Sequence, residues 1–205
     1  LAYTVQPSNV VAGAAIAPAV QVVVQDAHGN TATTSTASIT IAITSGTGAT
    51  GAVLGGTTTA AAVGGVATFS TLTVDKAGTG YTLTATAGGL ASATSAAFAV
   101  TPGAATKLVF SVQPSNVTRT IVIVPAVQVT VQDAWGNTVP SATTSVTLAI
   151  TNGTGATGAV MGGNLTVAAS NGVAAFTDLT VDKVGTGYTL SATAGGLTSA
   201  TSASF

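Results

Sequence analysis

The chain has 205 residues, of which 46% are hydrophobic and only 4% are charged, and its net charge is −1. This composition argues against a disordered chain, which is usually rich in charge, and against a nucleic-acid-binding surface, which needs clustered Lys and Arg. The absence of cysteine excludes disulfides and thiolate metal sites. The longest apolar tract, residues 10–24, is interrupted by Gly13, Pro18 and Gln21, so we expect no insertion into a membrane.

The sequence contains one unit twice. Leu1 aligns with Leu108, the register holds without a gap to Phe98 and Phe205, and about two thirds of the aligned residues are identical. We therefore predict two tandem domains, residues 1–100 and 108–205, joined by a linker at 101–107 that contains Pro102-Gly103. Both ends are expected to be cut from a longer string of similar units.

The first part of copy one alternates apolar and polar residues with the period of a β-strand. Val20, Val22 and Val24 are predicted to face the core, and Val23 to face outward, because Val23 becomes Thr130 in copy two. The extended segments expected here are residues 1–6, 10–16 and 20–24.

The rest of the copy predicts more short strands. Ile39, Ile41 and Ile43 alternate with polar or small residues, and Gly46 to Gly56 reads as a long loop. Roughly seven to nine short strands in about 100 residues are typical of a sandwich. We therefore predict an all-β fold of two tandem immunoglobulin-like antiparallel β-sandwiches. The remaining expected strands are residues 57–63, 66–74 with a bend at 70–71, the segment around Tyr81, and 90–100.

An acidic turn precedes a Gly-x-Tyr-x-Leu-x-Ala sequence in both copies, with Asp75 and Tyr81 in copy one and Asp182 and Tyr188 in copy two. This segment resembles the F strand of an immunoglobulin-like sandwich, whose Tyr hydroxyl bonds to backbone at the preceding corner. We predict a structural role for these four residues, in which each Asp caps backbone amides of its turn.

Four motifs shared by the two copies carry a family resemblance. They are Val-Gln-Pro-Ser, Pro-Ala-Val-x-Val-x-Val-x-Asp-Ala-x-Gly-Asn, Gly-Val-Ala-x-Phe and Gly-Thr-Gly-Tyr-x-Leu-x-Ala. Together they resemble the bacterial Ig-like repeats of the invasin and intimin type. The resemblance implies a domain of a long extracellular or cell-surface protein, in which most repeats are spacers and some tips bind receptors.

The turn after the third expected strand holds Asp26 and Asn30, or Asp133 and Asn137 in copy two. Calcium usually takes six to eight oxygen ligands with several carboxylates, so one Asp per turn favours a hydrogen-bonded turn over a metal site. The lone histidine, His28, is replaced by Trp135 in copy two. Because that exchange argues against catalysis or metal binding at this position, we regard the two residues as possible contact residues at an exposed turn tip.

The segment Gly46-Thr-Gly48-Ala-Thr-Gly51 matches the dinucleotide-binding pattern. That chemistry needs a following helix and an acid about 20 residues later, and the sequence after Gly51 is rich in Gly and Thr. A glycine-rich turn is the better interpretation. With no Glu and a single His, the chain offers no catalytic constellation, so we predict neither an enzyme nor a cofactor.

The scarcity of charge on the predicted wet faces, such as Thr82, Thr84 and Thr86, indicates surfaces that repel one another weakly. We expect a structural, extracellular repeat of a bacterial stalk, fibre or self-assembling filament, whose partners are copies of itself or adjacent repeats. Two alternatives remain open. One is an adhesin or carbohydrate-binding module that contacts surface glycans, and the other is a spacer domain of a secreted hydrolase.

Overall fold

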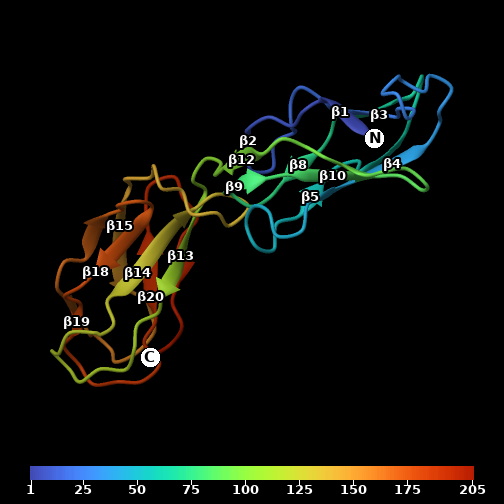
Figure 1. Ribbon diagram of the computed structural model, residues 1–205. Coiled ribbons are helices and arrows are strands. Elements are labelled where there is room, and N and C mark those ends of the chain that lie inside the picture. The colour runs from blue at the N-terminus through green and yellow to red at the C-terminus, as the bar shows by residue number, and fades with distance from the viewer. The chain divides into compact units, whose positions relative to one another are not determined.

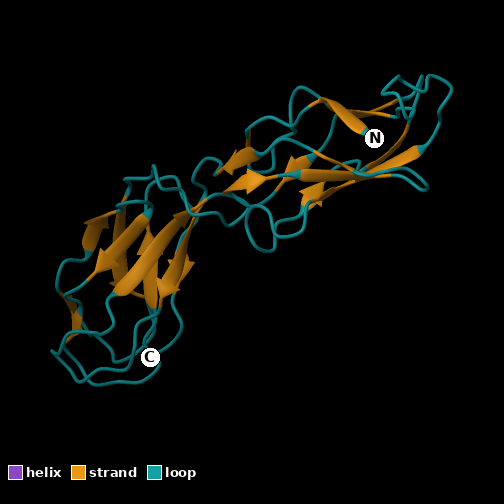
Figure 2. Ribbon diagram, viewed as in Figure 1, coloured by secondary structure: helices purple, strands orange, loops and turns teal.

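The computed structural model describes residues 1–205, which form strands, turns and loops and no helix (Figure 2). The predicted all-β class is confirmed. The chain divides into two compact units, Leu1–Gly103 and Ala104–Phe205 (Figure 1). The last strand of unit 1 ends at Thr101 and the first strand of unit 2 begins at Lys107, so the stretch between these strands is residues 102–106.

Unit 1 is built from twelve short strands in two facing layers. One layer has the order β1-β3-β7 and the other the order β11-β10-β4-β6, while β2-β12-β9 and β5-β8 form smaller sheets. All pairings are antiparallel except β2 with β12. The strands are β1 (Ala2–Val5), β2 (Val10–Val11), β3 (Val20–Val23), β4 (Ser38–Ile43), β5 (Leu54–Gly55), β6 (Thr59–Ala61), β7 (Val66–Phe69), β8 (Thr73–Val74), β9 (Gly78–Tyr81), β10 (Leu83–Thr86), β11 (Ala93–Thr94) and β12 (Phe98–Thr101).

The core of unit 1 lies between the two layers. Alternate residues of a strand point to opposite faces, so the valines of β3 and the isoleucines of β4 meet inside while their neighbours face water. Val20, Val22, Ile39 and Ile41 are buried, as predicted for the alternating segments. The other large side chains of this core are Ile16, Val24, Phe69, Leu72, Val74, Tyr81, Leu83, Phe98 and Val100.

Unit 2 repeats this plan with nine strands. Its layers have the orders β13-β14-β18 and β17-β15-β20-β21, with β16-β19 as a small sheet. Its core contains the equivalents of most of these residues, including Val127, Val129, Leu148 and Phe176. The strands are β13 (Lys107–Val112), β14 (Val127–Gln132), β15 (Ser145–Ile150), β16 (Met161–Gly162), β17 (Thr166–Ala168), β18 (Val173–Phe176), β19 (Thr180–Val181), β20 (Leu190–Thr193) and β21 (Ala200–Thr201).

Val23 points away from the core, as predicted, because the core cluster contains Val22 and Val24 but not Val23, yet Val23 is only 2% exposed. Its strand is the middle one of three, and Val23 lies directly opposite Ala2 of β1 and Val66 of β7. Directly opposite residues of paired strands share a face, so two aliphatic neighbours flank Val23 on the outer side of the sheet. Thr130 of unit 2 is buried in the same way.

Several predicted strands are shorter or divided. The expected segment 10–16 is a strand only at Val10–Val11, and the bend expected at residues 70–71 separates β7 from β8. The Tyr81 segment breaks at Thr82, so that β9 pairs with β12 while β10 pairs with β4. The segment 90–100 likewise divides into β11 and β12, which belong to different sheets.

Candidate contact surfaces and the corners that support them

A tyrosine corner closes each unit. Tyr81 is fully buried as a residue, and its hydroxyl donates a hydrogen bond to the carbonyl of Lys76 at 2.7 Å. Tyr188 donates in the same way to the carbonyl of Lys183 at 2.9 Å. Burial raises the pKa of the Tyr81 hydroxyl, so the group stays a proton donor. The Tyr81 ring also packs at a tilt against Phe98, with ring centroids 5.7 Å apart.

In each unit the aspartate of this corner is hydrogen-bonded to the glycine-rich loop. The Asp75 carboxylate accepts a hydrogen bond from the Val53 amide at 2.7 Å, and the Asp182 carboxylate accepts one from the Val160 amide at 2.7 Å. These partners lie 22 residues away in sequence. The carboxylate therefore joins two distant loops. This contact differs from the predicted one, in which each Asp caps backbone amides of its own turn.

The backbone conformation of the loop at residues 46–51 explains why its sequence matches the dinucleotide-binding pattern. Gly46, Gly48 and Gly51 all have positive φ, between 69° and 78°, which L side chains rarely adopt. Gly48 also lies against the Tyr81 ring, where a Cβ would overlap the ring carbons. No helix follows the loop, so the phosphate-binding mechanism has no structural basis here.

The Asp26 turn is a closed hydrogen-bonded unit. One carboxylate oxygen accepts the amides of His28 and Asn30 at 2.8 and 2.9 Å, and the other accepts the Asn30 side-chain amide at 3.1 Å. The Asn30 side-chain bond, followed by these backbone bonds, lowers the pKa of Asp26. The carboxylate oxygens are thus directed at the turn itself.

In the equivalent turn of unit 2, the Asp133 carboxylate accepts hydrogen bonds from the amide of Trp135 and from the backbone and side-chain amides of Asn137, at 2.8 to 2.9 Å. Here Asp133 and Asn137 are buried. The tips differ more: His28 is exposed, and Trp135 is 50% exposed. No group of three or more His, Cys, Asp or Glu side chains is placed to hold a metal ion in either unit.

A continuous uncharged surface covers the outer face of the β11-β10-β4-β6 sheet. We call it the hydroxyl face. Its residues lie opposite one another across the strands: Thr86 faces Thr40, and Thr40 faces Thr59. The Thr40 and Thr59 hydroxyls are 3.0 Å apart and hydrogen-bonded. The hydroxyl face consists of Ser38, Thr40, Ala42, Thr59, Ala61, Thr84, Thr86 and Thr94.

Unit 2 carries the same face on the β17-β15-β20-β21 sheet. Thr147 lies opposite Thr166 and Thr193, and the Thr147 and Thr166 hydroxyls are hydrogen-bonded at 2.9 Å. Between the two units only Thr84, which becomes Ser191, differs, and that change keeps the hydroxyl. The unit 2 residues are Ser145, Thr147, Ala149, Thr166, Ala168, Ser191, Thr193 and Thr201.

The sequence alone indicated only one row of this face, on the strand after Tyr81. The rows on β4 and β6 join it through strand pairing between segments about 20 and 40 residues apart, such as Thr40 with Thr59 and Thr44 with Thr84. The residues that alternate with Ile39, Ile41 and Ile43 could have indicated the second row. These residues are Ser38, Thr40 and Ala42, and none of them is charged.

Comparison with known proteins gives structural similarities only. No protein-family model matches the sequence, and no curated protein matches it. The structure contains no helix that is long and apolar enough to cross a membrane.

Among solved structures, the chain is similar to FdeC, an Escherichia coli adhesin, at 21% identity and a TM-score of 0.42 over 98% of this chain. It is similar to invasin, a bacterial integrin-binding protein, at 18% identity and a TM-score of 0.33 over 97% of this chain. A β-glucuronidase from Parabacteroides merdae is similar over 81% of this chain, at 13% identity and a TM-score of 0.36. The chain spans 62%, 37% and 20% of these three structures.

Proposed function

We propose that this chain is a non-catalytic structural repeat of a bacterial surface stalk or fibre, and that its units associate with copies of the same chain through the hydroxyl face. The single observation that carries the proposal is that this face is present in both units without one charged residue. Soluble domains usually carry about 25% charged residues, and charged side chains on sheets hinder association between neighbours.

The chemistry of the face suits repeated contacts between like surfaces. Threonine presents a methyl group and a hydroxyl, so two such faces can bury apolar area while each hydroxyl keeps a donor and an acceptor available. Several hydroxyls already pair within the sheet, which limits the cost of removing them from water. Lysine or glutamate on the face would have to lose hydration, and none is present.

The test is the mass of the chain in solution over a concentration series, measured by size-exclusion chromatography with light scattering. The proposal predicts mass that rises with concentration. The double variant Thr40→Lys with Thr147→Lys, one lysine on each hydroxyl face, should remain a monomer at the same concentrations. The matched control is Thr34→Lys with Ser141→Lys, which adds the same charge at exposed loop positions and should associate like the parent.

A monomer at every concentration would overturn self-association. So would equal association of the two double variants, because the added charge would then act without regard to its place on the surface.

A second candidate function is glycan binding by unit 2, and the exposed ring of Trp135 is the observation that favours it. An aromatic face stacks on the apolar side of a sugar ring, and Trp is enriched at binding hot spots. Glycan-array binding that disappears in Trp135→Ala and persists in His28→Ala would support this function. Absence of binding to every glycan tested would exclude Trp135 as a sugar contact on that array.

A further inference from the structure

Two asparagines of the chain are followed directly by glycine, and both lie in unit 2. The pairs are Asn152-Gly153 and Asn171-Gly172, where unit 1 has Ser45-Gly46 and Gly64-Gly65. Because glycine has no side chain, its amide nitrogen can approach the side-chain carbonyl of a preceding asparagine closely. Such a pair can cyclise with loss of the side-chain nitrogen, and asparagine is one of the thermolabile residues for this reason. In a folded chain the surrounding structure decides which pair is able to react.

The turn that contains Asn152 leaves the reacting groups free to move. The Thr154 amide and hydroxyl both donate to the Thr151 carbonyl, at 3.1 and 2.8 Å, so Asn152 and Gly153 are the two central residues of the turn. Gly153 has a φ of 79°, which the third residue of a type II turn requires. Both central residues are exposed, and a Cβ on Gly153 would meet no atom within 4 Å. The peptide bond between them makes no main-chain hydrogen bond, so it can rotate without losing one.

The turn that contains Asn171 is held more firmly. Asn171 and Gly172 have φ of 49° and 77°, as in a type I′ hairpin turn, and the residues on either side exchange two main-chain hydrogen bonds at 2.9 and 3.0 Å. The Gly172 carbonyl also accepts the Val131 amide at 2.8 Å. Gly172 packs against the Val139 carbonyl so closely that a Cβ would overlap it. Rotation at this pair therefore displaces a packed glycine and strains its hydrogen bond to β14.

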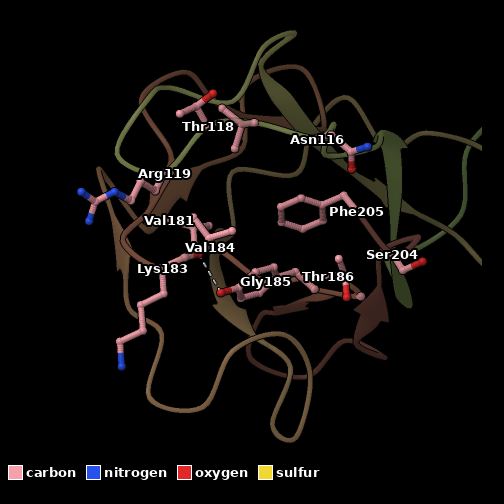
Figure 3. A pocket seen from close by; sticks show the side chains of 13 residues that line it. Asn116, Thr118, Arg119, Val181, Lys183, Val184, Gly185, Thr186, Ser204 and Phe205 are labelled. Carbon is pink, nitrogen blue, oxygen red and sulfur yellow. Dashed lines mark hydrogen bonds between the residues drawn. The ribbon is translucent and has the colours of Figure 1, made fainter.

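The loop that follows the Asn152 turn is anchored independently of that turn. Gly155 lies against the Tyr188 ring, and the Tyr188 hydroxyl donates to the Lys183 carbonyl, a bond drawn as a dashed line in Figure 3. Further along the loop, the Val160 amide donates to the Asp182 carboxylate at 2.7 Å. Opening of residues 151–154 is thus a local event, and the reaction does not require unit 2 to unfold.

We propose that Asn152 is a self-modification site, at which the folded chain converts a side-chain amide into a carboxylate with water as the co-reactant. The Gly153 amide nitrogen gives its proton to hydroxide and attacks the carbonyl carbon of the Asn152 side chain, which the chain holds next to it. A bond forms between these two atoms, and the bond from the carbon to the side-chain nitrogen breaks. Ammonia leaves after that nitrogen takes a proton from water, which regenerates the hydroxide. A water molecule then opens the five-membered imide at either carbonyl and gives aspartate or isoaspartate.

The reaction changes the charge and the main chain of the turn. Each product adds one negative charge to a chain whose net charge is −1. Isoaspartate also lengthens the main chain by one carbon atom between Thr151 and Thr154, so the hydrogen bonds that close the turn should be lost. The inference goes beyond the proposed function and does not depend on it, because the reaction occurs within one chain and Asn152 is not part of the hydroxyl face.

The test follows the whole isotope-labelled chain by NMR during incubation at mildly alkaline pH. The amide signals of Gly153 and Gly172 report the two pairs separately, because each signal moves when the asparagine before it reacts. The chain unfolded in urea gives the intrinsic rates, which should be similar for the two pairs. In the folded chain we expect Asn152 to react about tenfold or more faster than Asn171, because each hydrogen bond that must be broken slows the reaction by up to about tenfold. Equal rates in the folded chain would overturn the site. Persistence of Asn152 over a period in which the unfolded chain loses both asparagines would also overturn it.

Two variants move the pairs into the equivalent turns of unit 1. Ser45→Asn places an asparagine before Gly46, in a turn that has the same 3.1 Å main-chain hydrogen bond and open space at the glycine. Gly64→Asn places one before Gly65, whose carbonyl accepts a hydrogen bond at 2.8 Å as the Gly172 carbonyl does. Ser45→Asn should react at a rate close to that of Asn152, and Gly64→Asn should stay slow. Equal reaction of the two variants would show that the turn does not control the chemistry, and would overturn the proposal.

The variant Asn152→Ser restores the residue of unit 1 and removes the site. It should keep the fold, and it should lose the fast release of ammonia while the slow reaction at Asn171 remains. Fast release that persists in Asn152→Ser would come from another residue and would contradict the assignment to Asn152.

Discussion

Gly13 and Thr120 occupy equivalent positions in the two units and share a left-handed backbone, with φ of 77° and 65°. In each unit the amide at this position donates to a carbonyl of the neighbouring strand segment, Val74 or Val181, at 2.8 Å. The hydrogen bond therefore fixes the same conformation in both units. Glycine adopts it without steric cost, whereas a β-branched residue is a rare occupant of this region.

Replacement of Thr120 by glycine is expected to stabilise unit 2 by about 1 kcal/mol, because the left-handed conformation costs an L-residue about 1–2 kcal/mol and glycine gives back part of that gain through its greater freedom in the unfolded chain. Residue-resolved hydrogen exchange in unit 2 measures the change. The control is Asn171→Gly, at φ 49° and equivalent to Gly64, where asparagine already tolerates positive φ and the gain should be much smaller. Equal gains at both positions, or a loss at Thr120, would contradict the strain at this threonine.

The contact between Gly48 and the Tyr81 ring gives a second prediction. Gly48→Ala is expected to destabilise unit 1 by about 2–4 kcal/mol, because the new methyl group combines an unfavourable φ with overpacking against a buried ring. Gly51→Ala is the matched control. Gly51 has nearly the same φ, 73° against 69°, and open space at its Cβ position. Thermal unfolding of the two variants separates the cost of the unfavourable φ from the cost of overpacking. A similar loss of stability in both variants would show that the backbone conformation alone destabilises the unit.

The parts of this fold that the sequence predicted rest on local patterns. The alternation of Val20, Val22 and Val24 places three side chains on one face wherever the strand lies, and these residues are buried. The bend between β7 and β8 follows from a change of apolar phase within one segment. Such features need no knowledge of distant partners.

The parts that the sequence did not predict depend on strand pairing. Val23 is buried because Ala2 and Val66 lie beside it, and neither is near it in sequence. The hydroxyl face requires the register of Thr40 with Thr59 and with Thr86, which periodicity within one strand does not give.

The Asp26 turn predicts a pH effect at acid pH. Hydrogen bonds from Asn30 and His28 lower the pKa of Asp26 below its usual value of 3.8 in the folded chain. A carboxylate with a lowered folded pKa contributes stability that is complete above the unfolded value and is lost as the pH falls through the folded one. NMR titration of the Asp26 carboxyl should therefore give a midpoint below 3.8, and the His28 and Asn30 amides should lose protection over the same range. In Asn30→Ala the midpoint should rise, since the largest contribution comes from the Asn30 side chain. A midpoint at or above 3.8 in the parent would contradict the turn.

Tyr3 makes unit 1 sensitive to alkaline pH in a way that unit 2 is not. Its hydroxyl donates to the Leu83 carbonyl at 3.0 Å, and burial raises the pKa of Tyr3 above its usual 10.0. The unfolded chain then releases a proton near pH 10 that the folded chain retains, so the stabilising contribution is complete below pH 10 and is lost as the pH rises toward the folded pKa. The equivalent residue of unit 2 is Phe110, which has no proton to lose.

Hydrogen exchange followed from pH 8 to pH 11, corrected for intrinsic exchange rates, should show unit 1 losing stability more steeply than unit 2. Tyr3→Phe should reduce that slope, whatever it does to stability at pH 8. An unchanged slope in Tyr3→Phe would mean that Tyr3 ionises as freely in the folded unit as in the unfolded chain.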